Sequence, residues 1–358
     1  MFSTYLPDFE NYYEPFFGGG GTFFALQPKG KAFLNDKSTD LINFYKLLHS
    51  PSFKTELTKY ADAWEETTNV AAQLIPQLLP LFKNFIDGTI EAGFFNEATQ
   101  DVIIRKFEKE ETVLSDEAFM VDVENFLNRL IASVEDKCRR LKRITIQRGN
   151  EFKENELAQH IETGIKSGLY LFLRNLTNLQ FAGRLKMSDE KAAANWYFVR
   201  EFCYASMFRY SRKGNFNIPY GGIAYNKKNF RQKVGNIFSA DVKSLFANAA
   251  FYNLDFEDFL NKTNPTKNDF IFLDPPYDSE FSEYDQNVFN KADQQRLRDS
   301  LLKTKAKWML VIKETAFIRS LYDSPGCRFI EFDKTYTYNV RGRNNRETRH
   351  LIIVRTGI

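Results

Sequence analysis

Cysteine and histidine are scarce in this chain of 358 residues. Three cysteines occur, at Cys138, Cys203 and Cys327. Their odd number and wide spacing give neither a disulfide framework nor a zinc-ligand pattern, and a reducing compartment suits them. Three histidines are equally scattered, at His49, His160 and His350. We therefore expect structural roles for the histidines, no resident metal, and a cytoplasmic protein.

Long apolar runs are also missing. No segment reaches the roughly 20 apolar residues of a membrane span, and the first residues lack the charged, apolar and small pattern of a leader peptide. The net charge of +3 is too small by itself to indicate a nucleic acid partner. The remaining composition, 43% hydrophobic and 27% charged, is that of a globular chain with one large or two modest domains.

Both ends of the chain have an α/β pattern, and the middle does not. In residues 1–49 and again in 237–358, short apolar strands alternate with helical segments, which predicts a mostly parallel, doubly wound sheet. Residues 50–195 have leucines at helical spacing and few glycines, which predicts an inserted helical lobe. Residues 196–236 interleave aromatic and basic side chains with turn formers.

An apolar strand at 270–273 runs directly into the tetrapeptide Asp274-Pro275-Pro276-Tyr277. Two prolines end a strand, because neither donates a ladder hydrogen bond and each fixes φ. In such a turn Asp274 and a rigid carbonyl can accept hydrogen bonds from an amino group on a flat ring, and Tyr277 can cover the ring face. An ordinary turn that closes a buried strand explains the motif alone equally well.

A second element lies far upstream, where a predicted strand leads through Glu14-Pro15-Phe16-Phe17 into four glycines, 18–21, and a helix. Glycines there let a ligand approach the backbone closely. The loop lacks the lysine of a phosphate-binding loop, which argues against an NTPase and for a nucleoside without pyrophosphate, such as S-adenosylmethionine. Asp36, at the end of the next predicted strand, lies where nucleotide folds bind ribose hydroxyls.

Together these motifs resemble the Dam-like, alpha-group N6-adenine DNA methyltransferases, over residues 5–48 and about 196–355. The order of cofactor loop, recognition region and Asp-Pro-Pro-Tyr motif is the alpha-group order. The resemblance implies an α/β fold: a Rossmann-like S-adenosylmethionine methyltransferase sheet with an inserted helical and target-recognition lobe. Residues 196–236 would then be the target-recognition segment between the helical insertion and the second part of the catalytic domain.

The resemblance also implies the site residues. The cofactor S-adenosylmethionine would be bound by Glu14, Pro15, Phe16, Gly18, Gly20, Asp36, Asp255 and Phe256. Among these, Phe16 would contact the methionine part, Asp36 the ribose and Asp255 the adenine amino group. The catalytic residues would be Asp274, Pro275, Pro276 and Tyr277.

The chemistry of adenine N6 is consistent with these residue types. N6 is a poor nucleophile, because its lone pair is delocalised into the ring. Hydrogen bonds from N6 to the Asp274 carboxylate and the Pro275 carbonyl would localise that lone pair, so that in-line alignment supplies much of the rate. The target base lies inside a duplex and must be flipped out, with Tyr277 as its stacking platform.

The segment from Phe208 to Gly221 resembles the target-recognition segment of the family. Expected contacts with double-stranded DNA are Arg209, Arg212, Lys213, Asn215, Asn217, Tyr220, Lys227, Arg341 and Arg343. The basic members would contact phosphates or guanine edges. A solvated loop rich in charge is the alternative explanation for each of these basic clusters.

Only about a dozen residues precede Glu14, and they contain no Gly-Gly-Lys segment of the kind with which this family usually begins. We expect either that the start is truncated, or that another element or a partner subunit completes the cofactor pocket. The expected function is methylation of adenine N6 in a specific DNA sequence, in restriction–modification or phage defence. The alternatives are a non-catalytic or partner-dependent DNA-binding subunit with this fold, an N4-cytosine methyltransferase, and an RNA methyltransferase.

Overall fold

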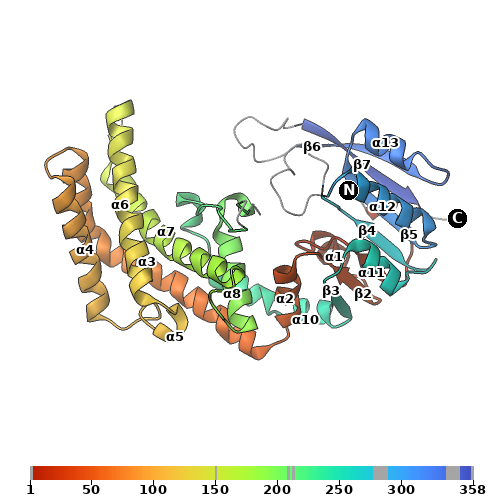
Figure 1. The fold of residues 1–358 in the computed structure, drawn as a ribbon, viewed down its shortest axis with the longest axis horizontal. Helices are drawn as coiled ribbons and strands as arrows, with labels where there is room; N and C mark the ends of the chain where they lie inside the picture. The colour runs from red at the N-terminus through yellow and green to blue at the C-terminus, as the bar shows by residue number, and fades with distance from the viewer. Residues whose placement is uncertain are drawn as a thin grey trace. The chain divides into compact units, whose positions relative to one another are not determined.

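A computed structural model describes residues 3–149, 151–207, 210–211, 214–276, 289–335 and 347–355 (Figure 1). The chain divides into two compact units. We call Met1–His49 together with Ser239–Ile358 the sheet unit, and Ser50–Phe238 the helical unit. The aromatic and basic segment 196–236 belongs to the helical unit. The functional assignment of these parts stays a prediction.

The sheet unit is built on a seven-stranded sheet with the strand order β3-β2-β1-β4-β5-β7-β6. Its strands are β1 (Tyr12–Glu14), β2 (Ala32–Asn35), β3 (Ala249–Tyr252), β4 (Phe270–Leu273), β5 (Lys307–Lys313), β6 (Arg328–Thr335) and β7 (Glu347–Arg355). The first five strands in this order pair in parallel, whereas β7 runs antiparallel to β5 and β6. The predicted α/β, Rossmann-like sheet is thereby confirmed.

Helices cover both faces of this sheet. Successive strand residues point to opposite sides, and here aromatic side chains on both sides pack against helices. Tyr12 contacts Phe23 on one face, with ring centroids 6.2 Å apart, and Phe23 stacks on Phe246. Tyr13 packs on the other face against Phe259, at 6.5 Å. The first face carries α1 (Gly21–Leu26), α2 (Thr39–Leu47) and α10 (Ala240–Phe246). The second carries α11 (Phe256–Thr263), α12 (Lys291–Lys303) and α13 (Ala316–Tyr322).

The chain order of the strands reverses between β1 and β4. From β1 the chain continues to β2 on one side, whereas β4 and β5 follow each other on the other side. The register pairs Tyr12 with Phe270 and Tyr13 with Ile271. The carboxyl ends of β1 and β4 therefore lie side by side, and open α/β sheets bind their ligands at such a reversal.

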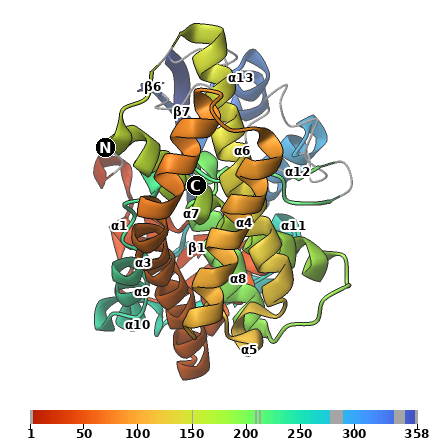
Figure 2. The same cartoon turned by 90° about the vertical axis from the view of Figure 1, so that its left-hand side faces the viewer.

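The helical unit contains α3 (Pro51–Ile86), α4 (Ala92–Lys109), α5 (Glu117–Met120), α6 (Val123–Arg148), α7 (Glu154–Phe181), α8 (Asp189–Phe202) and α9 (Phe230–Ile237). The long helices run alongside one another, with α7 packed against α3, α6 and α8 (Figure 2). At Gly168 an added Cβ would lie 2.7 Å from Leu130 Cα, so only glycine permits this approach of α7 to α6. None of the helices in the described ranges is long and apolar enough to cross a membrane.

Candidate active site

The glycine loop after β1 depends on left-handed backbone at Gly18 and Gly20, where φ is +51° and +70°. Glycine adopts this conformation without the penalty of a Cβ. At Gly20 a Cβ would also lie 2.8 Å from the ring of Phe17, which is buried beneath the loop. Gly20 then forms the N-cap of α1. The loop leaves the backbone of Gly18 and Gly19 uncrowded, with no atom within 4 Å of an added Cβ.

Asp36 fixes this loop from the end of β2. Its Oδ2 accepts a hydrogen bond from the Gly18 N–H at 2.9 Å, and its Oδ1 accepts one from the Ser38 N–H at 2.8 Å. A carboxylate oxygen can accept a second hydrogen bond, so each oxygen keeps capacity for a ligand. The structure therefore gives Asp36 a role in shaping the loop, and its contact with a ribose stays a prediction.

Asn35 was not among the residues predicted from the sequence, although it connects three parts of the site. Its buried amide donates to the Pro15 carbonyl at 3.0 Å and to the Leu254 carbonyl at 3.1 Å, and Oδ1 accepts from the Leu254 N–H at 3.0 Å. These bonds join β2 to the loops that follow β1 and β3. The only signal in the sequence is an amide next to an acid at a strand end.

Negative charge is concentrated at this edge of the sheet. Glu14 is buried, with 3% of its surface exposed, and Tyr12 donates a hydrogen bond to its Oε2 at 2.7 Å. Burial raises the pKa of Glu14 to about 8; the Tyr12 hydrogen bond opposes this shift, and the charges of Asp274 and Asp36 add to it. The raised pKa favours the protonated carboxyl of Glu14 at neutral pH, and a positive ligand would stabilise its ionised form.

The Asp-Pro-Pro turn follows β4 at the same edge. Asp274 and Pro276 are exposed, and Pro275 is buried. Gln294 of α12, which is fully buried, donates from Nε2 to the Pro276 carbonyl at 3.5 Å. Gln294 was not predicted from the sequence either. The predicted platform Tyr277 lies outside the described residues.

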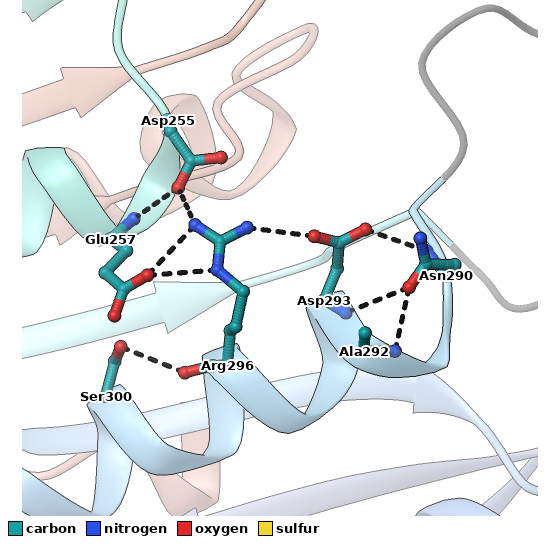
Figure 3. Close-up of polar contacts among 7 residues, drawn as sticks. All are labelled: Asp255, Glu257, Asn290, Ala292, Asp293, Arg296 and Ser300. Atoms are coloured by element: carbon teal, nitrogen blue, oxygen red, sulfur yellow. Dashed lines mark hydrogen bonds and ion pairs between the residues drawn. The ribbon is translucent and has the colours of Figure 1, made fainter.

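An aromatic cluster and an acid line the edge next to β3. The ring centroids of Phe16, Phe256 and Phe289 lie 5.6 to 5.7 Å from one another. Asp255 forms the N-cap of α11, and its Oδ1 also accepts a hydrogen bond from Arg296 at 2.7 Å (Figure 3). The structure thus brings Phe16 and Phe256, two of the residues predicted for the cofactor, into direct contact.

In the helical unit, residues 215–220 alternate between exposed and buried side chains. Asn215 and Asn217 are exposed, as a DNA contact requires, and so is Lys227. Tyr220 is 8% exposed, and its hydroxyl donates to Asn226 Oδ1 at 2.9 Å. The predicted DNA contact by Tyr220 finds no support in this arrangement, because its ring packs inside the unit. The other predicted contacts, Arg209, Arg212, Lys213, Arg341 and Arg343, lie outside the described residues.

Side chains of α7 bind the backbone of the predicted recognition segment at Phe216 and Ile218. Asn178 accepts from the Phe216 N–H at 2.7 Å and donates to the Phe216 carbonyl at 3.1 Å. Tyr170 and Arg174 both donate to the Ile218 carbonyl, at 2.8 and 2.9 Å. These α7 residues recur every four positions and so share one face of the helix. That face holds the segment by its backbone and leaves Asn215 and Asn217 directed outward.

Among the described residues, no group of three or more His, Cys, Asp or Glu side chains is placed to hold a metal ion. Around the ends of β1 and β4 the described residues present carboxylates, carbonyls and aromatic rings.

Comparison with known proteins agrees with this geometry. The profile of the D12 class N6 adenine-specific DNA methyltransferases matches residues 2–74 and 102–338. The Type II methyltransferase M.CviBI of Paramecium bursaria Chlorella virus NC1A is 30% identical over 223 residues, which are 57% of this chain and 82% of the viral protein.

Two further relatives match over shorter lengths. The Retron Ec67 DNA adenine methylase of Escherichia coli is 30% identical over 146 residues, which are 40% of this chain and 48% of the relative. The DNA adenine methylase of Vibrio cholerae serotype O1 is 27% identical over 156 residues, 41% of this chain and 53% of the relative. The chain thus spans about half the length of these two methylases. The resemblance predicted from the motifs is confirmed, and the chain belongs to the D12 class of N6 adenine-specific DNA methyltransferases.

Proposed function

We propose that the chain transfers the methyl group of S-adenosylmethionine to N6 of an adenine that is flipped out of a specific sequence in double-stranded DNA. One observation supports this most directly: the strand register places the glycine loop after β1 beside the Asp-Pro-Pro turn after β4. A cofactor bound at the glycine loop and a base bound at the Asp-Pro-Pro turn would therefore be neighbours.

The residues at the edge of the sheet suit S-adenosylmethionine, which supplies an electrophilic methyl group when bound. The left-handed glycines Gly18 and Gly20 open the backbone to close approach. Asp36 and Asp274, and Glu14 once a positive ligand has ionised it, would complement the positive charges of the sulfonium and the amino group.

We assign the parts of the cofactor to residues as follows. Pro15 and Phe16 would contact the methionine part, Asp36 the ribose, and Asp255 with Phe256 the adenine. The Oδ2 atom of Asp255 suits the adenine amino group, because the two hydrogen bonds that this side chain accepts from described residues both go to Oδ1.

The Asp-Pro-Pro turn would act on the target base. The Asp274 carboxylate and the Pro275 carbonyl would accept the two N6 hydrogens, which localises the N6 lone pair and directs it at the methyl group. Buried Pro275 and the hydrogen bond from Gln294 to Pro276 hold this turn in place. Such fixed positioning is worth several powers of ten in rate. Tyr277 would stack on the flipped base.

The role of Asp274 can be tested by measuring methyl transfer from labelled S-adenosylmethionine to duplex DNA with the purified chain. Asp274→Ala is expected to lower methyl transfer by at least about a hundredfold, because the acceptor for N6 is lost. Thermal unfolding and DNA binding of the variant should stay close to those of the wild type. Turnover retained by Asp274→Ala would contradict the assigned role.

Calorimetry of the wild-type chain with S-adenosylmethionine separates the enzyme from a non-catalytic or partner-dependent DNA-binding subunit. We expect binding by the isolated chain if an element of its own completes the cofactor pocket. Binding that appears only after a second subunit is added would instead support a partner subunit that completes the cofactor pocket.

We place this activity in restriction–modification or phage defence. One relative is named a Type II methyltransferase and another a retron DNA adenine methylase. Exposed Asn215, Asn217 and Lys227 would contribute to reading the target sequence. A cytoplasmic location, in contact with cellular or phage DNA, suits this role.

A further inference from the structure

Arg296 of α12 binds three carboxylates at the edge of the site (Figure 3). Its Nη2 lies 2.7 Å from Asp255 Oδ1 and 2.9 Å from Glu257 Oε2, and its Nη1 lies 2.9 Å from Asp293 Oδ1. A guanidinium offers five donors in a fixed plane, so a single side chain can bridge these partners where a lysine could not.

The contacts with Arg296 and Glu257 fix the orientation of the Asp255 carboxylate. The Oδ1 atom accepts hydrogen bonds from Arg296 and from the Glu257 N–H, at 2.7 and 3.1 Å. The Oδ2 atom has no hydrogen-bond partner among the described residues. The Asp255 side chain is 26% exposed, so part of it is open to a ligand.

The same guanidinium packs on the ring of Phe256. The central carbon of Arg296 lies 4.9 Å from the ring centroid, within the range of a cation–π contact. The ring also contacts Phe16 and Phe289. Arg296 therefore restrains both an open carboxylate oxygen and the neighbouring aromatic surface.

We propose that Arg296 is the positioning residue that makes the cofactor pocket selective for adenine, by holding Asp255 Oδ2 toward the 6-amino group and Phe256 against the ring. This inference rests on the proposed binding of S-adenosylmethionine. Arg296 does not touch the reacting atoms, and it acts through Asp255 and Phe256.

The test compares two ligands by calorimetry: S-adenosylhomocysteine, and its analogue with unsubstituted purine in place of adenine. Wild-type protein is expected to prefer the adenine form. Arg296→Ala should weaken the adenine form at least about tenfold more than the purine form, because both forms use the Phe256 ring but only the adenine form uses the Asp255 hydrogen bond. Asp255→Ala should lose the same preference for the adenine form. The double variant, Arg296→Ala with Asp255→Ala, should show no further loss of this preference.

Arg319→Ala is the matched control. Arg319 lies on α13 of the same unit, binds Glu314 and Glu331, and packs over Phe329 at 5.8 Å. Its side chain is 40% exposed, against 41% for Arg296. Removal of Arg319 should lower the melting temperature to a similar degree without a change in ligand preference.

An equal loss of affinity for both ligands in Arg296→Ala would show a merely structural role and overturn the inference, as would an unchanged preference. If Arg296→Ala does not fold, Arg296→Lys keeps a charge at the site and should show a reduced preference; a full preference in that variant also overturns the inference. Failure of the wild type to bind either ligand would instead refute the proposed function on which the inference rests.

Discussion

At the scale of single residues, the burial of Glu14 affects both the charge of the site and the stability of the fold. Its carboxyl is buried at the end of β1, and burial raises its pKa to about 8. The folded chain therefore holds a proton that an unfolded chain, with a pKa near 4.5, releases. By linkage, this group makes the free energy of unfolding fall as the pH rises from about 4.5 toward 8.

A positive ligand should reverse that protonation. S-adenosylmethionine is expected to release a proton from Glu14 at pH 7, so that its affinity rises by up to about tenfold per pH unit until the pH reaches the free-protein pKa. Calorimetry in two buffers of different ionisation enthalpy measures the released proton. Equal binding enthalpies in both buffers, or the same proton release by Glu14→Gln, would contradict the prediction.

The geometry of the glycine loop can be tested by comparing alanine substitutions at the neighbouring residues Gly20 and Gly19. Gly20→Ala should destabilise the protein by at least about 1–2 kcal/mol, because its φ is +70° and the new Cβ would meet the Phe17 ring. Gly19 has no positive φ and open space around it. Thermal unfolding of Gly19→Ala should match the wild type, and equal losses in the two variants would argue against the strained loop.

At the scale of elements, α7 provides the frame for the recognition segment. Asn178→Ala should leave the buried N–H and carbonyl of Phe216 without their partners, at a local cost of about 1–3 kcal/mol. We expect a KM for DNA about tenfold higher, with the Kd for S-adenosylmethionine unchanged, because the residues proposed to bind the cofactor belong to the sheet unit. Asn128→Ala, at an exposed position of α6, is the control. A variant Asn178→Ala with wild-type KM for DNA would show that this frame does not position the segment.

The sheet and its main motifs were predictable because their signals are local. An apolar strand followed by two prolines, or a strand followed by glycines and a helix, is visible within ten residues of sequence. The strands that end at Glu14 and directly before Asp36 and Asp274 were predicted in this way, and the structure has strands at each of those places.

The helical side chains that hold the proposed functional residues in place could not be predicted in the same way. Asn178, Gln294 and Arg296 are polar residues in amphipathic helices, where a solvated position is the ordinary expectation. Their partners are 38, 18 and 41 residues away in the chain. Such roles depend on which elements become neighbours, and a pattern within one helix does not contain that information.

At the scale of the whole molecule, the helical unit is an insertion between α2 and α10 of the sheet unit. The strands on either side of it, β2 and β3, still pair in parallel from Ala32 with Ala249 to Asn35 with Tyr252. One polypeptide can thus keep a continuous parallel sheet and add a separately packed unit that carries Asn215 and Asn217. This division accords with an enzyme that must both position a methyl donor and read a DNA sequence.

The central claim is that the whole chain methylates adenine N6 at a defined sequence. Its most direct test is single-molecule sequencing of genomic DNA from a methylase-deficient host that expresses the chain, with Asp274→Ala as the matched inactive variant. We predict N6-methyladenine at one recurring sequence motif with the wild type and none with the variant. Genomic adenines that stay unmodified although the folded wild-type chain is present, or N4-methylcytosine in their place, would contradict the claim.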